Sequence, residues 1–337
     1  MNSNLRLLAF LGIASSAASA EPRYSLVKEI PIEGASGWDY LQADPASHRV
    51  YVSHGTEVEV IDTLTETVVG KIADTQGVHG IAVAPELGRA FVSDGRANQV
   101  SIVDTSTLST LLKVETGTNP DAILYNPAHR EVYAFNGRSA SVTVINAEKG
   151  QAVSTVALGG KPEFAQVDPV ADRVFDNLED KNEVVVIDGA SHAVLARWPI
   201  APGESASGMA IDTEHHRLFL GCENEMMVVV DSESGKVVAN LPAGKGIDAA
   251  AFDPGTQLAF TSNGRNGTVT IVHEDTPDTY AVVQTLATER GARTMSVDTS
   301  THRIYLATAK FGPPPAGGGR PPIIPGSFKV LVYGIGP

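Results

Sequence analysis

A short sequence landmark recurs seven times along the chain at nearly constant spacing. Each copy has an acidic or small residue, usually followed by proline, then a short turn and a β-rich run. Successive copies lie 40 to 45 residues apart and begin at Asp44, Ala84, Asn126, Asp168, Asp212, Asp253 and Asp298. Such a period, with several short strands per unit, is typical of a β-propeller. The repeat therefore predicts one ring of seven blades, although a length of 337 residues alone would favour two domains.

Each unit contains four β-rich runs separated by turn residues, as in the second unit between residues 80 and 115. The seventh unit has only three such runs before the chain ends. The N-terminal segment Tyr24–Pro31 resembles the outer strands of the other units. We therefore expect this segment to complete blade seven and close the ring. Residues 21–337 are predicted to form one all-β domain of four-stranded antiparallel blades.

The N-terminus has the pattern of an export signal in residues 1–20. Arg6 supplies a positive charge, residues 7–13 form an apolar run, and Ala18-Ser19-Ala20 is a small-residue cleavage site. The apolar run is too short to span a bilayer. We expect cleavage after Ala20 and a soluble periplasmic or secreted protein without membrane insertion; an uncleaved anchor is the alternative. Cys222 is the only cysteine, so no intrachain disulfide is possible, and a buried filler role is expected.

Three segments resemble YVTN-type propeller repeats: Arg49–Ser53, Val100–Asp104 and Gly159–Pro162. On these residues, the region from about 24 to 336 is similar to the YncE family of exported bacterial propellers. The resemblance implies a periplasmic or secreted seven-bladed propeller, and it implies no single activity because family roles differ and include DNA binding. The formal net charge of −14 argues against nucleic acid and anionic membranes as partners.

The repeat also aligns residues that begin the inner strand of each blade. Five residues before each landmark stand Asp39, His79, Asp121, Glu163, Ser207, Asp248 and Arg293. Because seven inner strands converge at the channel mouth, these side chains are expected to form a charged ring that binds a ligand. Closely spaced carboxylates repel one another unless a cation relieves them, and Ca²⁺ prefers oxygen ligands. Asp121, Glu163 and His79 are therefore candidate ligands of a divalent cation such as calcium.

A second set of residues ends the second strand of each blade, on the same face. His54, Asn136 and Asn263 belong to this set and are candidate ligand-binding residues in an outer ring. The alternative is structural, since Asp or Asn followed by Gly commonly forms turns. Four histidines recur in the turn between strands one and two, so we interpret them as turn residues: His48, His129, His216 and His302. His215 lies beside His216, and the pair alone is poor evidence for metal.

One long insertion, Lys310–Ser327, interrupts the seventh unit between its second and third strands. Its prolines favour an extended chain and Gly317–Gly319 supply a hinge. The connection falls on the same face as the predicted charged ring. We interpret it as a flap over the channel mouth or a proline-rich docking segment; a tolerated surface loop is the alternative.

The sequence has no His-Glu-x-x-His motif, no Gly-x-Ser-x-Gly elbow, no haem attachment motif and no phosphate loop. The leading hypothesis is an exported, monomeric, non-enzymatic propeller that binds a small molecule or protein at the charged mouth. The alternative is a metal-dependent hydrolase or lyase, similar to gluconolactonase-like propellers, in which metal-activated water acts in the channel. Its site would use Glu163, Asn136, Asp121 and His79. A third hypothesis is an accessory subunit of a redox system.

Overall fold

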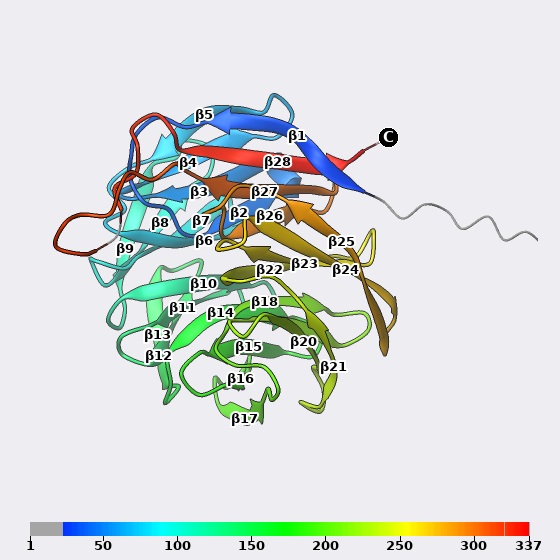
Figure 1. The fold of residues 1–337 in the computed structure, drawn as a ribbon. Coiled ribbons are helices and arrows are strands. Elements are labelled where there is room, and N and C mark those ends of the chain that lie inside the picture. The colour runs from blue at the N-terminus through cyan, green and yellow to red at the C-terminus, as the bar shows by residue number, and fades with distance from the viewer. Residues whose placement is uncertain (1–22, 320, 337) are drawn as a thin grey trace, which may run out of the picture.

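The computed structural model describes residues 23–319 and 321–336. Seven four-stranded antiparallel sheets form a ring, so the chain is a seven-bladed β-propeller, as the repeat predicts (Figure 1). The only helical segments in the described residues are two short 3₁₀ turns, η1 (Pro45–Ser47) and η2 (Pro85–Leu87). The predicted export signal, residues 1–20, lies outside the described part of the chain.

The strands of each blade follow one another outward from the axis, and inner strands of neighbouring blades contact one another around the ring. The inner strands are β2 (Leu41–Asp44), β6 (Val78–Ala84), β10 (Pro120–Asn126), β14 (Pro162–Asp168), β18 (Ala206–Asp212), β22 (Ile247–Asp253) and β26 (Met295–Asp298). The second strands are β3 (Arg49–His54), β7 (Arg89–Asp94), β11 (Glu131–Asn136), β15 (Arg173–Leu178), β19 (Arg217–Cys222), β23 (Leu258–Asn263) and β27 (Arg303–Thr308).

The third strands are β4 (Glu57–Asp62), β8 (Gln99–Asp104), β12 (Ser141–Asn146), β16 (Glu183–Asp188), β20 (Met226–Asp231), β24 (Thr268–Thr276) and β28 (Lys329–Ile335). The outer strands of blades one to six are β5 (Thr67–Ile72), β9 (Thr110–Glu115), β13 (Gln151–Ala157), β17 (Val194–Pro199), β21 (Val237–Pro242) and β25 (Thr279–Ala287).

The outer strand of blade seven is β1 (Tyr24–Pro31), which comes from the start of the described chain. It pairs antiparallel with β28 from Tyr24 opposite Ile335 to Pro31 opposite Lys329. In Figure 1 this pairing places the blue first strand beside the red last strand. The predicted closure of the ring by the N-terminal segment is therefore confirmed.

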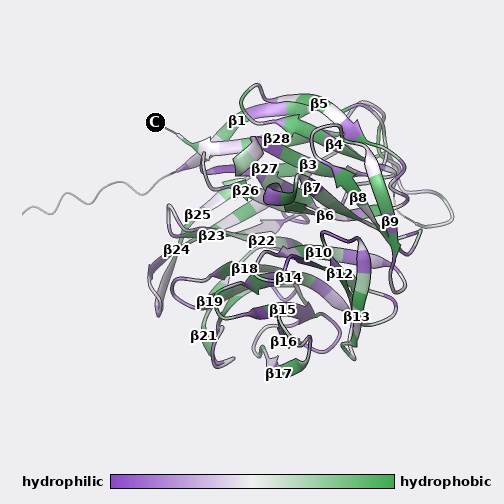
Figure 2. Ribbon diagram, turned by 180° about the vertical axis from the view of Figure 1, so that it is seen from behind, coloured by the Kyte–Doolittle hydropathy of each residue, from purple (hydrophilic) through white to green (hydrophobic). Residues whose placement is uncertain are grey.

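A buried aromatic residue occupies the same position of the second strand in every blade. All seven of these side chains are fully buried: Tyr51, Phe91, Tyr133, Phe175, Phe219, Phe260 and Tyr305. Large rings suit the gap between two packed sheets because each buries a wide apolar surface. Hydrophobic residues accordingly run along the strands of the blades (Figure 2).

The landmark residues end the inner strand and form the turn that leads to the second strand. The Oδ1 atom of Asp168 accepts hydrogen bonds from the backbone amides of Val170 and Ala171, both at 2.9 Å. The residue that precedes the second strand is left-handed in every blade, with φ between 53° and 60°: His48, Gly88, Arg130, Asp172, His216, Gln257 and His302. The recurring histidines therefore occupy turn positions, as the repeat suggests.

Ring closure gives a direct stability prediction. Ile30 of β1 is 2% exposed and packs in the core between blades seven and one, whereas Leu26 of the same strand is 49% exposed. Ile30→Ala should lower the free energy of unfolding by about 2–5 kcal/mol because it leaves a cavity at the closing strand. Leu26→Ala is the matched control and should change stability little. Equal effects in denaturant titration would contradict this role of β1.

Candidate functional site

The seven residues that begin the inner strands lie together at one end of the channel. Asp39, His79, Asp121, Glu163, Ser207, Asp248 and Arg293 all line a single cavity of about 570 Å³. We call this the mouth cavity. The predicted inner ring is thus brought together by the structure, although its role in binding stays a prediction.

Two aromatic side chains from distant blades meet across the channel, and Tyr40, but not Phe164, lines the mouth cavity. Tyr40 of blade one and Phe164 of blade four meet with ring centroids 5.1 Å apart. The other blades have small residues at the same position: Gly80, Ala122, Gly208, Ala249 and Thr294. At Gly208 an added Cβ would lie 2.4 Å from the backbone nitrogen of Ala250, so neighbouring inner strands approach closely there.

One wall of the mouth cavity holds a histidine between two carboxylates. The Nδ1 atom of His79 lies 2.6 Å from Asp39 Oδ2 and 3.5 Å from Asp121 Oδ1. Burial alone would lower the pKa of His79, but its hydrogen bond to Asp39 and the charge of Asp121 outweigh burial and raise the pKa. One donor atom from each of the three residues lies within 4.8 Å of the others, which is close enough to hold a metal ion.

Glu163, the third residue predicted to bind a metal, pairs with Lys161 and does not belong to that group of three. Lys161 pairs with both Glu163 and Glu179. Burial, followed by the negative charge of Asp121, raises the pKa of Glu163 to about 8, and burial raises that of Asp121 to about 6. Carboxyl groups with such pKa values can carry a proton near neutral pH.

A fully buried carboxyl group lies behind Glu163. Asp176 on β15 is 0% exposed, and burial together with the charge of Glu163 raises its pKa well above the usual range. The equivalent positions in the other blades are Val52, Val92, Ala134, Leu220, Thr261 and Leu306. Asp176 is therefore a departure from the repeat that the alignment of blades makes visible, and the sequence-based search for site residues missed it.

On the opposite wall Arg293 connects blades six, seven and one. Its Nη1 atom lies 2.7 Å from Asp248 Oδ2, and its Nη2 atom donates a hydrogen bond to the Trp38 carbonyl at 3.2 Å. The Trp38 indole donates in return to the Arg293 carbonyl at 3.3 Å. Burial raises the pKa of Asp248, while the charge of Arg293 opposes that shift. This arginine fixes the wall of the cavity on which Trp38 lies.

The predicted outer ring is not part of the cavity. His54, Asn136 and Asn263 are at most 2% exposed, and none of them lines the mouth cavity. The Asn136 amide donates to the hydroxyls of Ser141 and Thr143, at 3.1 and 3.0 Å, and Asn263 bonds Thr268 and Thr270 in the same way. The His54 ring stacks on Phe328, with centroids 4.4 Å apart. In the two asparagines these contacts tie the second strand to the third.

Two arginines that the sequence-based search missed lie at the rim. Arg96 and Arg138 line the mouth cavity from the turns between the second and third strands of blades two and three. Each follows an acidic or amide residue and a glycine, and Arg265 stands at the same place in blade six. This recurring triplet of Asp or Asn, Gly and Arg is the sequence pattern from which these arginines could have been predicted. The rim is thus basic at blades two and three, whereas Glu179 and Glu223 occupy the corresponding turns of blades four and five.

The insertion Lys310–Ser327 lies beside the mouth cavity and projects at the left of Figure 1. Phe311 packs against Trp38, with ring centroids 6.0 Å apart, and forms a β-bridge with Ile323. A neighbouring pocket of about 570 Å³ is lined by Phe311 and Pro321 on one side and by Ile247 and Arg290 on the other. Arg293 lines both this pocket and the mouth cavity. The flap role stays a prediction.

Comparisons with known proteins support the fold and leave the family open. No protein-family model and no curated protein matches the chain. A solved structure similar to it is a chain of Kuenenia stuttgartiensis hydrazine synthase, with a TM-score of 0.53 and 16% identity over 71% of this chain and 96% of that chain. Likeness at this identity shows the propeller fold alone, and the resemblance to the YncE family stays an expectation. Within residues 23–319 and 321–336, no helix is long and apolar enough to cross a membrane.

The raised pKa of Glu163 predicts a pH dependence of stability. A carboxyl group whose pKa rises from 4.5 to about 8 on folding stabilises the protein fully below the lower value. That contribution to stability is lost as the pH rises to the upper value. Asp121 and His79 act in the same direction, because their pKa values are also raised. The melting temperature should therefore fall between pH 5 and 8.5, and Glu163→Gln should flatten the fall. The exposed control Glu233→Gln should leave the profile unchanged; an identical profile for both variants would refute the assignment.

Proposed function

We propose that this protein is an exported, monomeric, non-enzymatic propeller that binds a small organic molecule in the mouth cavity. The observation that carries this proposal is that one charged or polar residue from each of the seven blades lines a single cavity. Cavities with convergent polar groups beside apolar surface are the usual form of small-molecule sites. The acidic net charge supports a partner other than nucleic acid.

The lining of the two pockets suggests the character of the ligand. In the mouth cavity the carboxylates of Asp39, Asp121 and Asp248 face His79 and Arg293, so acidic and basic groups are interleaved. The adjoining pocket beneath Phe311 exposes more apolar than polar surface. A molecule with a polar part and an apolar part fits this pair of pockets. Phe311, which is 44% exposed, would cover the apolar part.

Tryptophan fluorescence offers a test, because the chain has only Trp38 and Trp198. In a Trp198→Phe background, Trp38 alone reports on the mouth cavity, and an anilinonaphthalene sulfonate dye serves as an amphipathic probe. Phe311→Ala in this background should weaken dye binding about tenfold, the equivalent of losing part of a buried aromatic contact. Leu195→Ala, which changes an exposed residue on β17, is the control. Unchanged dye affinity in the Phe311 variant would count against the pocket.

The second candidate function is a metal-dependent hydrolase or lyase. It is favoured by one observation, the convergence of Asp39, His79 and Asp121 within 4.8 Å. The imidazole nitrogen in this group suits Zn²⁺ or Mn²⁺ better than Ca²⁺, which prefers oxygen ligands alone. A bound ion would lower the pKa of its water, and Glu163 is placed in the same cavity to accept or hold a proton.

Hydrolysis of lactones and esters by chelator-treated protein, with and without Zn²⁺ or Mn²⁺, separates the two functions. If the protein is a hydrolase, the metal should restore turnover and Asp121→Asn should lower it by about a hundredfold or more. Asp248→Asn, which removes a carboxylate from the other wall, should have a much smaller effect. Absence of metal-dependent turnover would leave the binding function as the proposal.

A further inference from the structure

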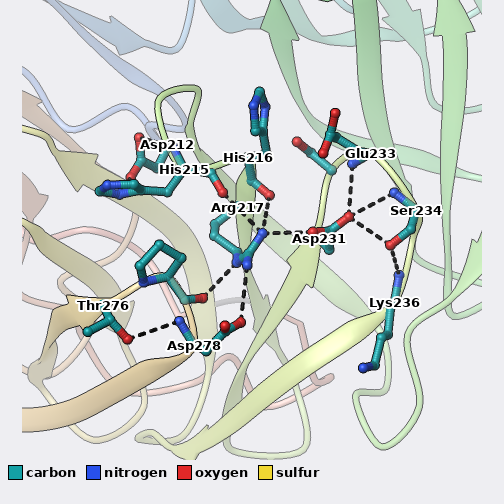
Figure 3. A network of polar contacts seen from close by, with 12 residues as sticks. Asp212, His215, His216, Arg217, Asp231, Glu233, Ser234, Lys236, Thr276 and Asp278 are labelled. Carbon is teal, nitrogen blue, oxygen red and sulfur yellow. Dashed lines mark hydrogen bonds and ion pairs between the residues drawn. The ribbon is translucent and has the colours of Figure 1, made fainter.

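A second group of ionisable side chains lies at the seam between blades five and six, on the face opposite the mouth cavity. Asp212 ends the inner strand β18, and His215 follows in the turn that leads to β19. Glu274 lies near the end of β24 in the neighbouring blade. Figure 3 shows Asp212 and His215 beside the arginine network of the same turn. No part of the proposed function uses these residues.

Glu274 occupies a position where blades one to five have small residues. In each of blades one to six, the backbone amide at this position donates to the carbonyl of the left-handed turn residue, as Glu274 does to Gln257 at 2.9 Å. The equivalent residues are Thr63, Thr105, Ala147, Gly189 and Ser232. At Gly189 an added Cβ would lie 2.0 Å from Asp172 Oδ1, so the position is crowded. Blade six alone among these places a long acidic side chain there.

An extended hairpin holds Glu274 against blade five. β24 and β25 are nine residues long, and the third and outer strands of blades one to five have six or seven. Arg217 of blade five donates from Nε to the Pro277 carbonyl at 2.7 Å, and its Nη2 lies 3.2 Å from Asp278 Oδ1 (Figure 3). Its Nη1 lies 2.7 Å from Asp231 Oδ2. The charge of Arg217 is thus directed to Asp231 and Asp278, and the arginine positions the hairpin.

His215 lies between the two remaining carboxylates. Its Nδ1 atom is 2.7 Å from Asp212 Oδ2 and 3.7 Å from Glu274 Oε1, and the three donor atoms lie within 4.8 Å of one another. The other oxygen of Asp212, Oδ1, accepts the backbone amide of Glu214 at 2.9 Å. Asp212 is therefore fixed by its turn, with Oδ2 directed at the histidine.

The carboxylate of Glu274 is buried without a hydrogen-bond donor. The residue is 3% exposed, and neither carboxylate oxygen has a hydrogen-bond partner in the described part of the chain. A buried charged group without partners is costly, so native proteins pair such groups or use them to coordinate metals.

We propose that Asp212, His215 and Glu274 bind one divalent transition-metal ion of the zinc class. Metal–ligand bonds of about 2.0–2.2 Å place neighbouring donor atoms roughly 3 to 3.5 Å apart, which is close to the observed separations. One imidazole nitrogen and two carboxylates are a donor set that Zn²⁺ accepts. The His215 side chain is 30% exposed, so water can reach the remaining coordination positions. The ion would join blade five to the hairpin of blade six.

Titration of the chelator-treated full chain with Zn²⁺ alone tests this site, followed by calorimetry and by melting temperature. Zn²⁺ should raise the melting temperature of the unchanged protein. Glu274→Gln keeps the shape of the side chain and should weaken Zn²⁺ binding at this site by at least about tenfold, as should His215→Ala. Glu214→Gln is the matched control, since this exposed neighbour carries the same charge and lies outside the group. Co²⁺ in place of Zn²⁺ gives an absorption signal that His215→Ala should abolish.

Two results would overturn the proposal. If only Asp121→Asn removes the bound ion, the metal lies in the mouth cavity. If Glu274→Gln stabilises the chelator-treated protein and Zn²⁺ changes the melting temperature of neither protein, the two carboxyl groups share a proton in place of a metal. Circular dichroism of each variant in chelator separates loss of binding from loss of folding. The mouth-cavity ligand plays no part in this test, so the two proposals fail independently.

Discussion

The packing of each twisted sheet against its two neighbours is the constraint on which the rest of this structure depends. A fully buried aromatic residue from the second strand of every blade fills the space between sheets, and Gly80 and Gly208 let their inner strands approach the next blade closely. Because the inner strands converge, a residue at or just before the start of each one reaches the same cavity. The scaffold thus brings together seven side chains that are some 40 residues apart in sequence. The identities of these seven side chains can vary, because packing between the blades, and not the side chains themselves, stabilises the ring of strands.

The repeat in the sequence was enough to predict the blades, the closing strand and the convergence of the seven inner-ring residues, because all of these follow from position within a unit. It could not predict which ring residues pair. His79 meets Asp39, while Glu163 meets Lys161, and these contacts depend on side-chain directions. His54, Asn136 and Asn263 were placed on the correct face, yet burial within the blades separates them from the cavity. The contact between Tyr40 and Phe164 could not be predicted, because it joins blades one and four and leaves no pattern within a single repeat.

Both faces of the propeller use a similar arrangement, a histidine between two carboxylates, and differ in how it is enclosed. His79 lies in an open cavity with several charged neighbours, so its protonation depends on the whole ring. His215 lies at a narrow seam, where Glu274 has no donor of its own in the described residues. On each face one acidic residue departs from the repeat: Asp176 lies behind Glu163 of the mouth cavity, and Glu274 lies at the seam. Departures from a well-kept repeat are where function or added stability is expected.

The closing pair of strands joins residues about 300 positions apart in the chain. Contacts between such distant segments form slowly, because a long loop must close before they contribute any stability. The first strand therefore has no partner until the last one has been synthesised, and the growing chain carries an unpaired edge for most of its time on the ribosome. Blades one to six can pair their consecutive strands before that point, so the late step is the completion of blade seven and the closing of the ring.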